Sequence, residues 1–211
     1  MTNASYRTLT AWLLAGWFIF ALVASALHAF KTDASPARAL GAAVATPLIL
    51  FLLWYGFSAG FREFVLSLNP RTLTLMHAWR IAGYTFLVLY AYGILPGIFA
   101  LPAGWGDIAI GATAPLVAFK LANPRHRSSF ILWQVLGMAD LVIAVTMGTT
   151  ARLIHPHGIA TGAMTVLPLS LIPTFAVPLL LMLHVIAIAQ ARRWPAREQA
   201  GVSGQVRRVA A

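Results

Sequence analysis

The chain has 211 residues, of which 60% are hydrophobic and only 9% are charged. Soluble domains usually carry about 25% charged residues, so this chain has too little polar surface for an ordinary water-soluble protein. There is no cysteine, which excludes disulfides, thiol catalysis and cysteine-ligated metal centres. The net charge of +10 comes from basic residues between apolar blocks, which indicates loops that face anionic lipid rather than a nucleic-acid surface.

Six apolar stretches are candidate membrane spans, because crossing the hydrocarbon core takes roughly 20 apolar residues in a helix. Backbone amides in lipid must be bonded within their own segment or to other parts of the protein, and the stretches lack the alternating polarity of a membrane β-strand. The sequence therefore predicts an all-α integral membrane protein, a bundle of about six transmembrane helices forming one domain over 1–190. The predicted spans are 9–30, 39–57, 73–95, 104–121, 129–150 and 164–189, followed by a basic tail over 191–211.

The first span admits a second interpretation. Residues 24–26 read "ASA", which resembles the cleavage site of a signal peptide. However, the apolar run is longer than a usual signal-peptide core, and no polar stretch precedes the site. These features favour a first helix that is not removed.

A shorter apolar segment, "FREFVLSL" at 61–68, lies between the second and third spans. Its apolar residues recur at i, i+3, i+4 and i+7, so they share one face of a helix. Those residues are Phe61, Phe64, Val65 and Leu68. Because the segment is too short to cross a bilayer, we predict an interfacial helix whose apolar face lies against lipid.

Basic residues indicate how the chain is threaded. With a cytoplasmic N-terminus, eleven Lys and Arg residues fall on the cytoplasmic side and three on the outer side. Such a bias predicts that both termini are cytoplasmic. Arg outnumbers Lys thirteen to two and alanine is abundant, which indicates a GC-rich bacterium and hence its inner membrane. The expected partners are the lipid bilayer and its anionic headgroups, and no nucleic acid.

Asp107 is the only charged residue between Ile81 and Phe119, within "GWGDIAIG" at 104–111. The preceding stretch, 93–104, contains two Leu-Pro steps and several glycines, so it is either a tight turn or a re-entrant segment. We expect Asp107 to begin a helix and to cap its free backbone N–H groups. The alternative is an ion or substrate site.

Asp140 lies near the middle of the fifth span, where an ionised carboxylate costs at least ~2.5 kcal/mol. A capping role cannot explain an acid inside a helix. Arg80 in the third span is its predicted partner, at an axial offset of roughly 6 Å. Alternatively, the Arg80 side chain extends to the headgroups, or the pair forms but serves only structure.

His77 and His184 lie at similar depths in the third and sixth spans. Two facing imidazoles could ligate a b-type haem, relay protons with Asp140, or simply bond to a neighbour or to water. No other metal site is expected. In the sixth span, Pro168, Pro173 and Pro178 predict a kinked helix with free carbonyls, because proline lacks a backbone donor.

Ionisable residues inside a membrane are functional sites by default. The leading hypothesis is therefore a transporter or permeation protein for a small solute or ion, with proton coupling as an option, rather than an enzyme. The residues assigned to it are Asp140, Arg80, His184 and Asp107. The alternatives are a redox subunit with haem between His77 and His184, and an accessory protein whose polar residues only hold helices together.

Overall fold

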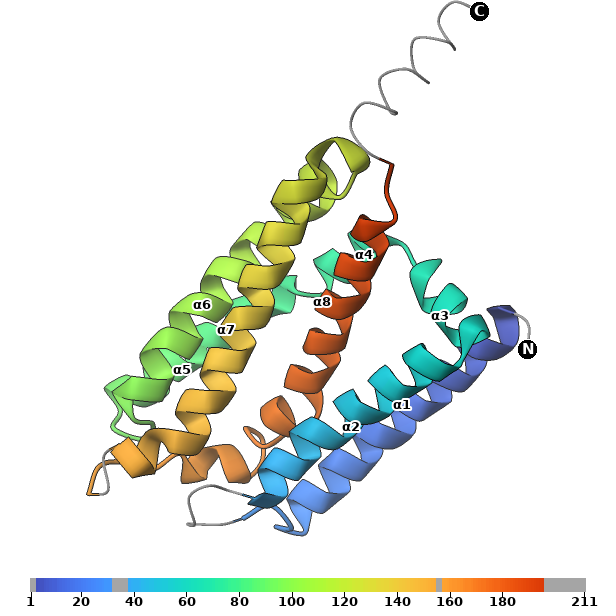
Figure 1. Ribbon diagram of the computed structural model, residues 1–211. Helices are drawn as coiled ribbons and strands as arrows, with labels where there is room; N and C mark the ends of the chain where they lie inside the picture. Colours follow the sequence, from blue (N-terminus) through green and yellow to red (C-terminus); the bar gives the residue numbers. More distant parts are fainter. Residues whose placement is uncertain (1–2, 32–37, 155–156, 196–211) are drawn as a thin grey trace, which may run out of the picture.

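A computed structural model describes residues 3–31, 38–154 and 157–195, and all regular structure within these ranges is helical (Figure 1). Four helices in the described ranges are long and apolar enough to cross a membrane, which is consistent with a membrane protein. They are Asn3–Ala26, Arg38–Phe57, Pro124–Ala151 and Ile172–Arg192. The first two correspond to α1 (Asn3–Ala26) and α2 (Arg38–Phe57), which run antiparallel. The predicted tail lies outside the described residues from 196 onward.

The third predicted span, 73–95, is not one helix. It consists of α4 (Pro70–Leu75), the 3₁₀ helix η1 (Ala78–Gly83) and α5 (Tyr84–Ala91). The prediction of a continuous span was wrong because apolar content indicates burial and says nothing about which helical hydrogen bonds form. Short 3₁₀ stretches between α-helical segments often mark functional hinges.

The fourth predicted span begins earlier than expected. α6 (Gly97–Leu116) starts directly after a turn in which Gly93 has a φ of +69°. The stretch 93–104 is therefore a tight turn followed by helix, and not a re-entrant segment. Asp107 lies in the interior of α6, so its predicted capping role was wrong. The two Leu-Pro steps and the glycines of this stretch indicated an interrupted segment, whereas α6 continues through the second step at Pro102.

The second half of the chain contains the long α7 (Arg127–Ile154) and the most buried helix, α8 (Val177–Arg192). Between α6 and α7 lie the π-helical η2 (Val117–Leu121) and the 3₁₀ helix η3 (Pro124–His126), and between α7 and α8 lie the 3₁₀ helix η4 (Gly162–Thr165) and the π-helical η5 (Ile172–Ala176). The sixth predicted span thus begins at Ile172 rather than at 164, because a bend and turns at 166–170 separate η4 from the helix that follows.

The short helix α3 (Ala59–Leu66) exists, but its apolar face is covered by protein. The Phe61 ring stacks on Trp54 with centroids 3.8 Å apart, and Phe64 stacks on Tyr6 at 5.9 Å. Gln190 of α8 donates to the Leu68 carbonyl just after α3, at 2.7 Å. The prediction that this face lies against lipid was therefore wrong, since α1, α2 and α8 supply its partners.

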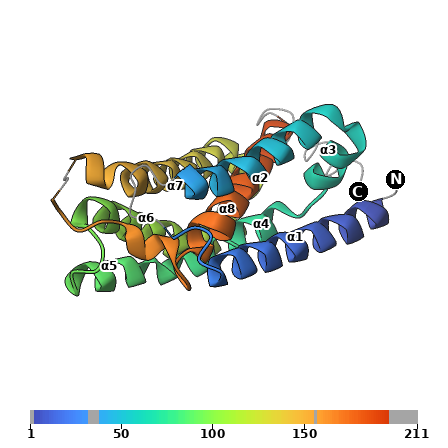
Figure 2. The same cartoon turned by 90° about the horizontal axis from the view of Figure 1, so that it is seen from below.

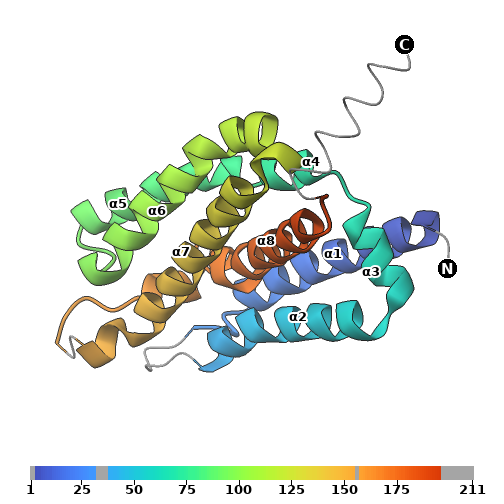
Figure 3. The ribbon, with the colours of Figure 1, turned by 45° about the horizontal axis from the view of Figure 1, so that its top comes forward.

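α8 occupies the centre of the molecule, with α7 on one side and α2 on the other (Figures 2 and 3). Half of the residues in the apolar stretch of Ile172–Arg192, which contains α8, are buried, against 11% for α1 and for α2. α1 and α2 instead present large apolar side chains outward, including Trp12, Phe20 and Leu50. The start of α1, α3 and the α6–α7 connection gather at one end of the molecule, and the end of α1, the α5–α6 turn and the end of α7 at the other (Figure 1).

Candidate functional site

A buried ion-pair cluster lies where η1, α6, α7 and α8 meet. Arg80 projects from η1 and is only 2% exposed. Its Nε donates to Oδ1 of Asp107 on α6 at 2.6 Å, and its Nη2 donates to Oδ2 of Asp140 on α7. We refer to Arg80, Asp107, Asp140 and His184 as the Arg80 cluster. These two salt bridges are the only ones among the described residues. Arg80 is the cation of both.

The remaining guanidinium nitrogen faces α7 and α8. Nη1 of Arg80 donates to the Gly137 carbonyl at 3.2 Å and lies 3.4 Å from Nε2 of His184. Every side of the guanidinium therefore has an acceptor, as a buried arginine requires. The alternative in which Arg80 extends to the headgroups was wrong. The structure instead brings together all four predicted residues, including the Arg80–Asp107 pair, which the sequence did not indicate.

Three glycines leave the space that the cluster occupies. A Cβ added at Gly106 would lie 1.6 Å from Oδ1 of Asp140. At Gly83 it would lie 2.3 Å from the Asp107 Cβ, and at Gly137 it would lie 2.6 Å from Cε1 of His184. Any larger side chain at these positions would displace a member of the cluster, so the three glycines set its geometry.

The Arg80 cluster contains two acids and one permanent cation. With both carboxylates ionised, its net charge is one negative unit, since His184 is neutral when it accepts from Arg80. The side chains of Asp107 and Asp140 are each 16% exposed, whereas that of Arg80 is 1% exposed. No hydrogen-bond donor in the described part of the chain reaches Oδ2 of Asp107 or Oδ1 of Asp140. These oxygens are free to accept a proton or to bind a cation.

A chain of hydrogen bonds leads from the cluster towards α4. Nδ1 of His184 lies 2.5 Å from Oε1 of Gln134, which can only accept, so Nδ1 carries the proton and Nε2 faces Arg80. Nε2 of Gln134 donates to Thr74 at 3.2 Å, and Thr74 donates to the Pro70 carbonyl at 2.8 Å. Sequence reasoning missed Gln134 and Thr74, although a lone amide in the apolar fifth span was a usable signal.

His77 and His184, the two residues of the haem alternative, lie against each other in a way that does not fit a haem. Their rings stack with centroids 3.9 Å apart and planes 21° apart, which leaves no space for a porphyrin between them. Both nitrogens of His184 are also engaged, with Gln134 and Arg80. Both nitrogens of His77 are buried without a hydrogen-bond partner. Across the described ranges, no three His, Asp or Glu residues are grouped so that they could hold a metal ion.

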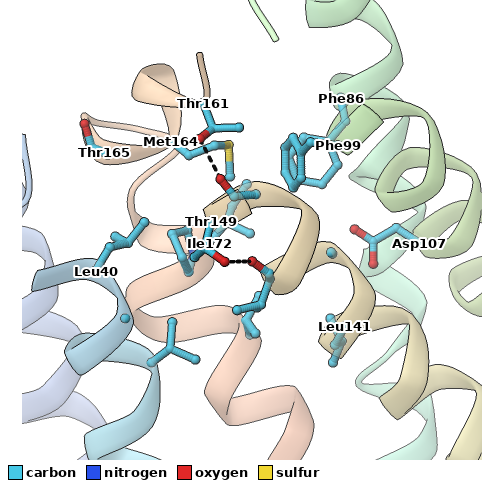
Figure 4. Close-up of a pocket in the computed structure, with 17 residues that line it drawn as sticks. Leu40, Phe86, Phe99, Asp107, Leu141, Thr149, Thr161, Met164, Thr165 and Ile172 are labelled. Atoms are coloured by element: carbon cyan, nitrogen blue, oxygen red, sulfur yellow. Dashed lines mark hydrogen bonds between the residues drawn. The ribbon is translucent and has the colours of Figure 1, made fainter. Parts of the chain in front are cut away.

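Asp107 lines two adjoining cavities, and among the described residues it is the only acidic one in either lining. One, of about 80 Å³, extends towards the end of α7 and is lined by Phe99, Gly148 and Thr161 (Figure 4). The other, of about 240 Å³, lies on the side of Arg80, Trp79 and Leu180. Asp107 is therefore the member of the Arg80 cluster that faces both cavities.

Residues 37–192 match the model of a protein family described as a domain of unknown function (DUF8737). The chain belongs to this family. No curated protein and no solved structure is detectably similar to it. The matched segment contains the whole Arg80 cluster, together with Gln134 and Thr74, and it leaves out α1. The cluster is thus part of the family domain, and α1 lies outside the matched segment.

Proposed function

We propose that this protein is a transport or permeation protein for a small solute or ion, and that the Arg80 cluster binds and releases a proton during transit. The observation that carries the proposal is the sharing of one buried guanidinium by two carboxylates. A buried unpaired charge is strongly unfavourable, so the second carboxylate needs a proton or another cation. Proton or cation binding at this site is therefore coupled to the arrangement of η1, α6 and α7.

The proposed location is a bacterial inner membrane, with both termini cytoplasmic. Four helices with the length and composition of membrane spans support it, as does the excess of basic residues at one end of the molecule. In this orientation the hydrogen bonds from His184 to Thr74 lead towards the cytoplasm, and the smaller cavity leads towards the outer side. The Arg80 cluster then separates two half-pathways.

Proton binding changes the partners of Arg80. When Asp140 is protonated, the guanidinium pairs with Asp107 alone, and the charge of the cluster falls to zero. When Asp140 loses the proton, it again competes with Asp107 for Arg80. Because the two acids lie on different helices, this competition favours different positions of α6 and α7 relative to η1.

Proton flux through proteoliposomes tests the proposal. The purified protein is reconstituted with the pH-sensitive dye pyranine inside, and pH and potential gradients are imposed in sodium and in potassium buffers. We expect flux with the wild-type protein and its loss to the level of protein-free liposomes in Asp140→Asn. The matched control is Glu63→Gln, which removes an exposed carboxylate from α3 and leaves flux unchanged. Normal flux in a correctly folded Asp140→Asn protein contradicts the proposal.

An accessory role is the second candidate, and the full set of acceptors around Arg80 favours it. A guanidinium bonded to α6, α7 and α8 at once holds these helices together whether or not anything moves. In this case Asp140→Asn lowers the thermal unfolding midpoint, and neither protein gives flux above protein-free liposomes. The two candidates thus differ in the wild-type flux itself.

A further inference from the structure

We infer that the cavities beside Asp107 bind a small lipophilic cation, such as a protonated amine on an apolar body, that enters from the lipid side. The inference rests on the proposed function and names the substrate class for the same site. It is carried by three observations: the apolar lining of the cavities, the charge that faces into them, and an apolar groove that leads to them.

The lining of the smaller cavity suits an apolar body rather than a hydrated ion. Phe86, Phe99, Leu141 and Met164 surround the cavity, with Asp107 at its edge (Figure 4). Apart from Asp107, the side-chain oxygens of the lining belong to three threonines, and each hydroxyl donates to a backbone carbonyl. Thr161 donates to Gly148 and Thr165 to Gly162, both at 2.7 Å, and Thr149 donates to Val145 at 2.9 Å. Only four of the side chains in the lining carry an oxygen, and the others are apolar or glycine, so the lining offers few ligands to replace the water around an inorganic cation.

The charge that a ligand meets is negative. Oδ1 of Asp107 accepts from Arg80, whereas Oδ2 has no partner in the described ranges and lies beside Gly83, which lines the larger cavity. The guanidinium is almost completely covered, so the carboxylate dominates the surface of the site. An ammonium group would complete the charge balance of the Arg80 cluster, whereas a carboxylate or phosphate ligand would add to its excess of negative charge.

The larger cavity continues into an apolar groove on the outside of the molecule. This groove has a volume of about 490 Å³ and shares Trp79, Ile172, Ala176 and Leu180 with the cavity. Phe18 and Met76, which also line it, are 40% and 43% exposed on the apolar surface. A ligand that is already dissolved in the bilayer can therefore reach Asp107 without crossing water, which favours a lipophilic substrate.

A matched ligand series tests the inference. The probes are 4-phenylbutylamine, 4-phenylbutanol and 4-phenylbutanoate, which share one apolar body and differ in charge. Binding is measured by calorimetry with the full chain in zwitterionic nanodiscs, and the heat with empty nanodiscs is subtracted. We expect the amine to bind about tenfold more tightly than the alcohol, from one charge-assisted bond, and the carboxylate not to bind.

Two variants locate the binding site. Asp107→Asn is expected to abolish the preference for the amine over the alcohol, whereas Glu63→Gln retains it. Gly148→Leu fills the smaller cavity without touching an ion pair. We expect it to lower the affinity for both the amine and the alcohol. This variant tests the inference even if Asp107→Asn does not fold.

Equal affinities for amine and alcohol, or a preference that survives Asp107→Asn in folded protein, would overturn the inference. If the same protein shows proton flux that depends on Asp140, that result contradicts only the ligand inference and not the proposed function. Conversely, an Asp107-dependent preference in a protein without flux under proton or amine gradients supports the binding site and contradicts transport.

Discussion

Gly106 shows at the scale of one residue how closely the helices approach around the Arg80 cluster. It precedes Asp107 in α6, and its Cα faces the carboxylate of Asp140 on α7. With a methyl group there, Oδ1 of Asp140 would have to move by more than an ångström, because real contacts to a Cβ are not shorter than 3.0 Å. The position of one acid is thus set by the residue next to the other.

Gly106→Ala is therefore expected to destabilise the protein by about 1–3 kcal/mol, as overpacking in a dense core does. The measurement is the thermal unfolding midpoint of purified protein in detergent. Gly16→Ala is the matched control, since nothing lies within 4 Å of its added Cβ. That exchange should be neutral or stabilising by up to about 1 kcal/mol, from the higher helix propensity of alanine. An unchanged midpoint for Gly106→Ala would contradict the described approach of α6 and α7.

The position of Asp140 in its helix could be predicted from the sequence, whereas that of Asp107 could not. Asp140 lies in the interior of a long uninterrupted span, so its depth could be counted from the ends of the span. Arg80 could then be chosen as its partner, because its depth in the third span is similar. Asp107 follows a stretch rich in glycine and proline, where the start of the helix is ambiguous. The helix begins ten residues before it, at Gly97, and this turns a capping residue into a member of the cluster.

At the scale of an element, the start of α8 shows how proline connects two helices. Pro178 has no N–H to give to the carbonyl four residues earlier, that of Thr174. The indole Nε1 of Trp17 in α1 donates to this carbonyl at 3.1 Å. The free carbonyls predicted from the prolines of the sixth span thus include one that binds α1, which otherwise has few partners in the core.

A double-mutant cycle tests this connection. Trp17→Phe keeps an aromatic ring beside Phe175 and removes the donor, so we expect a loss of about 0.5–1.5 kcal/mol. In a Pro178→Ala background the backbone N–H can satisfy Thr174, and the same exchange should have a smaller effect. The free energy of unfolding of the four proteins gives the coupling. Additive effects would mean that the proline and the indole are independent.

Long apolar elements were predictable, and interrupted ones were not. The spans at 39–57 and 129–150 match α2 and α7 because each is charge-poor, long and bounded by polar residues. The span at 73–95 has the same composition, but it breaks into three helical segments against α6, where the backbone at Ile81 lies close to Gly111. This break depends on contacts between distant parts of the chain, which local apolar patterns do not contain.

At the scale of the whole molecule, the loops fall into two groups at opposite ends, and the basic residues favour one of them. The end that carries the α6–α7 connection includes Lys120, Arg125 and Arg127, whereas Lys31 and Arg38 lie at the other. This division follows from the order of the spans. It is unaffected by the breaks in the third predicted span and by the late start of the sixth predicted span.

Single cysteines can report the threading directly, because the chain has none of its own. Ser128→Cys and His157→Cys place a thiol at exposed positions on opposite ends. We expect a membrane-impermeant maleimide to label position 157 in intact cells, and position 128 only after lysis. The wild-type chain is the unlabelled control. The reverse pattern would show that the termini are on the outer side.

The 3₁₀ form of η1 has a mechanical consequence. A 3₁₀ helix rises about 2.0 Å per residue and an α-helix about 1.5 Å, so converting the six residues of η1 would shorten the segment by about 3 Å. Converting η1 to an α-helix would therefore move Arg80 relative to Asp107 on α6 and Asp140 on α7, so the helical form of this segment and the two ion pairs depend on each other.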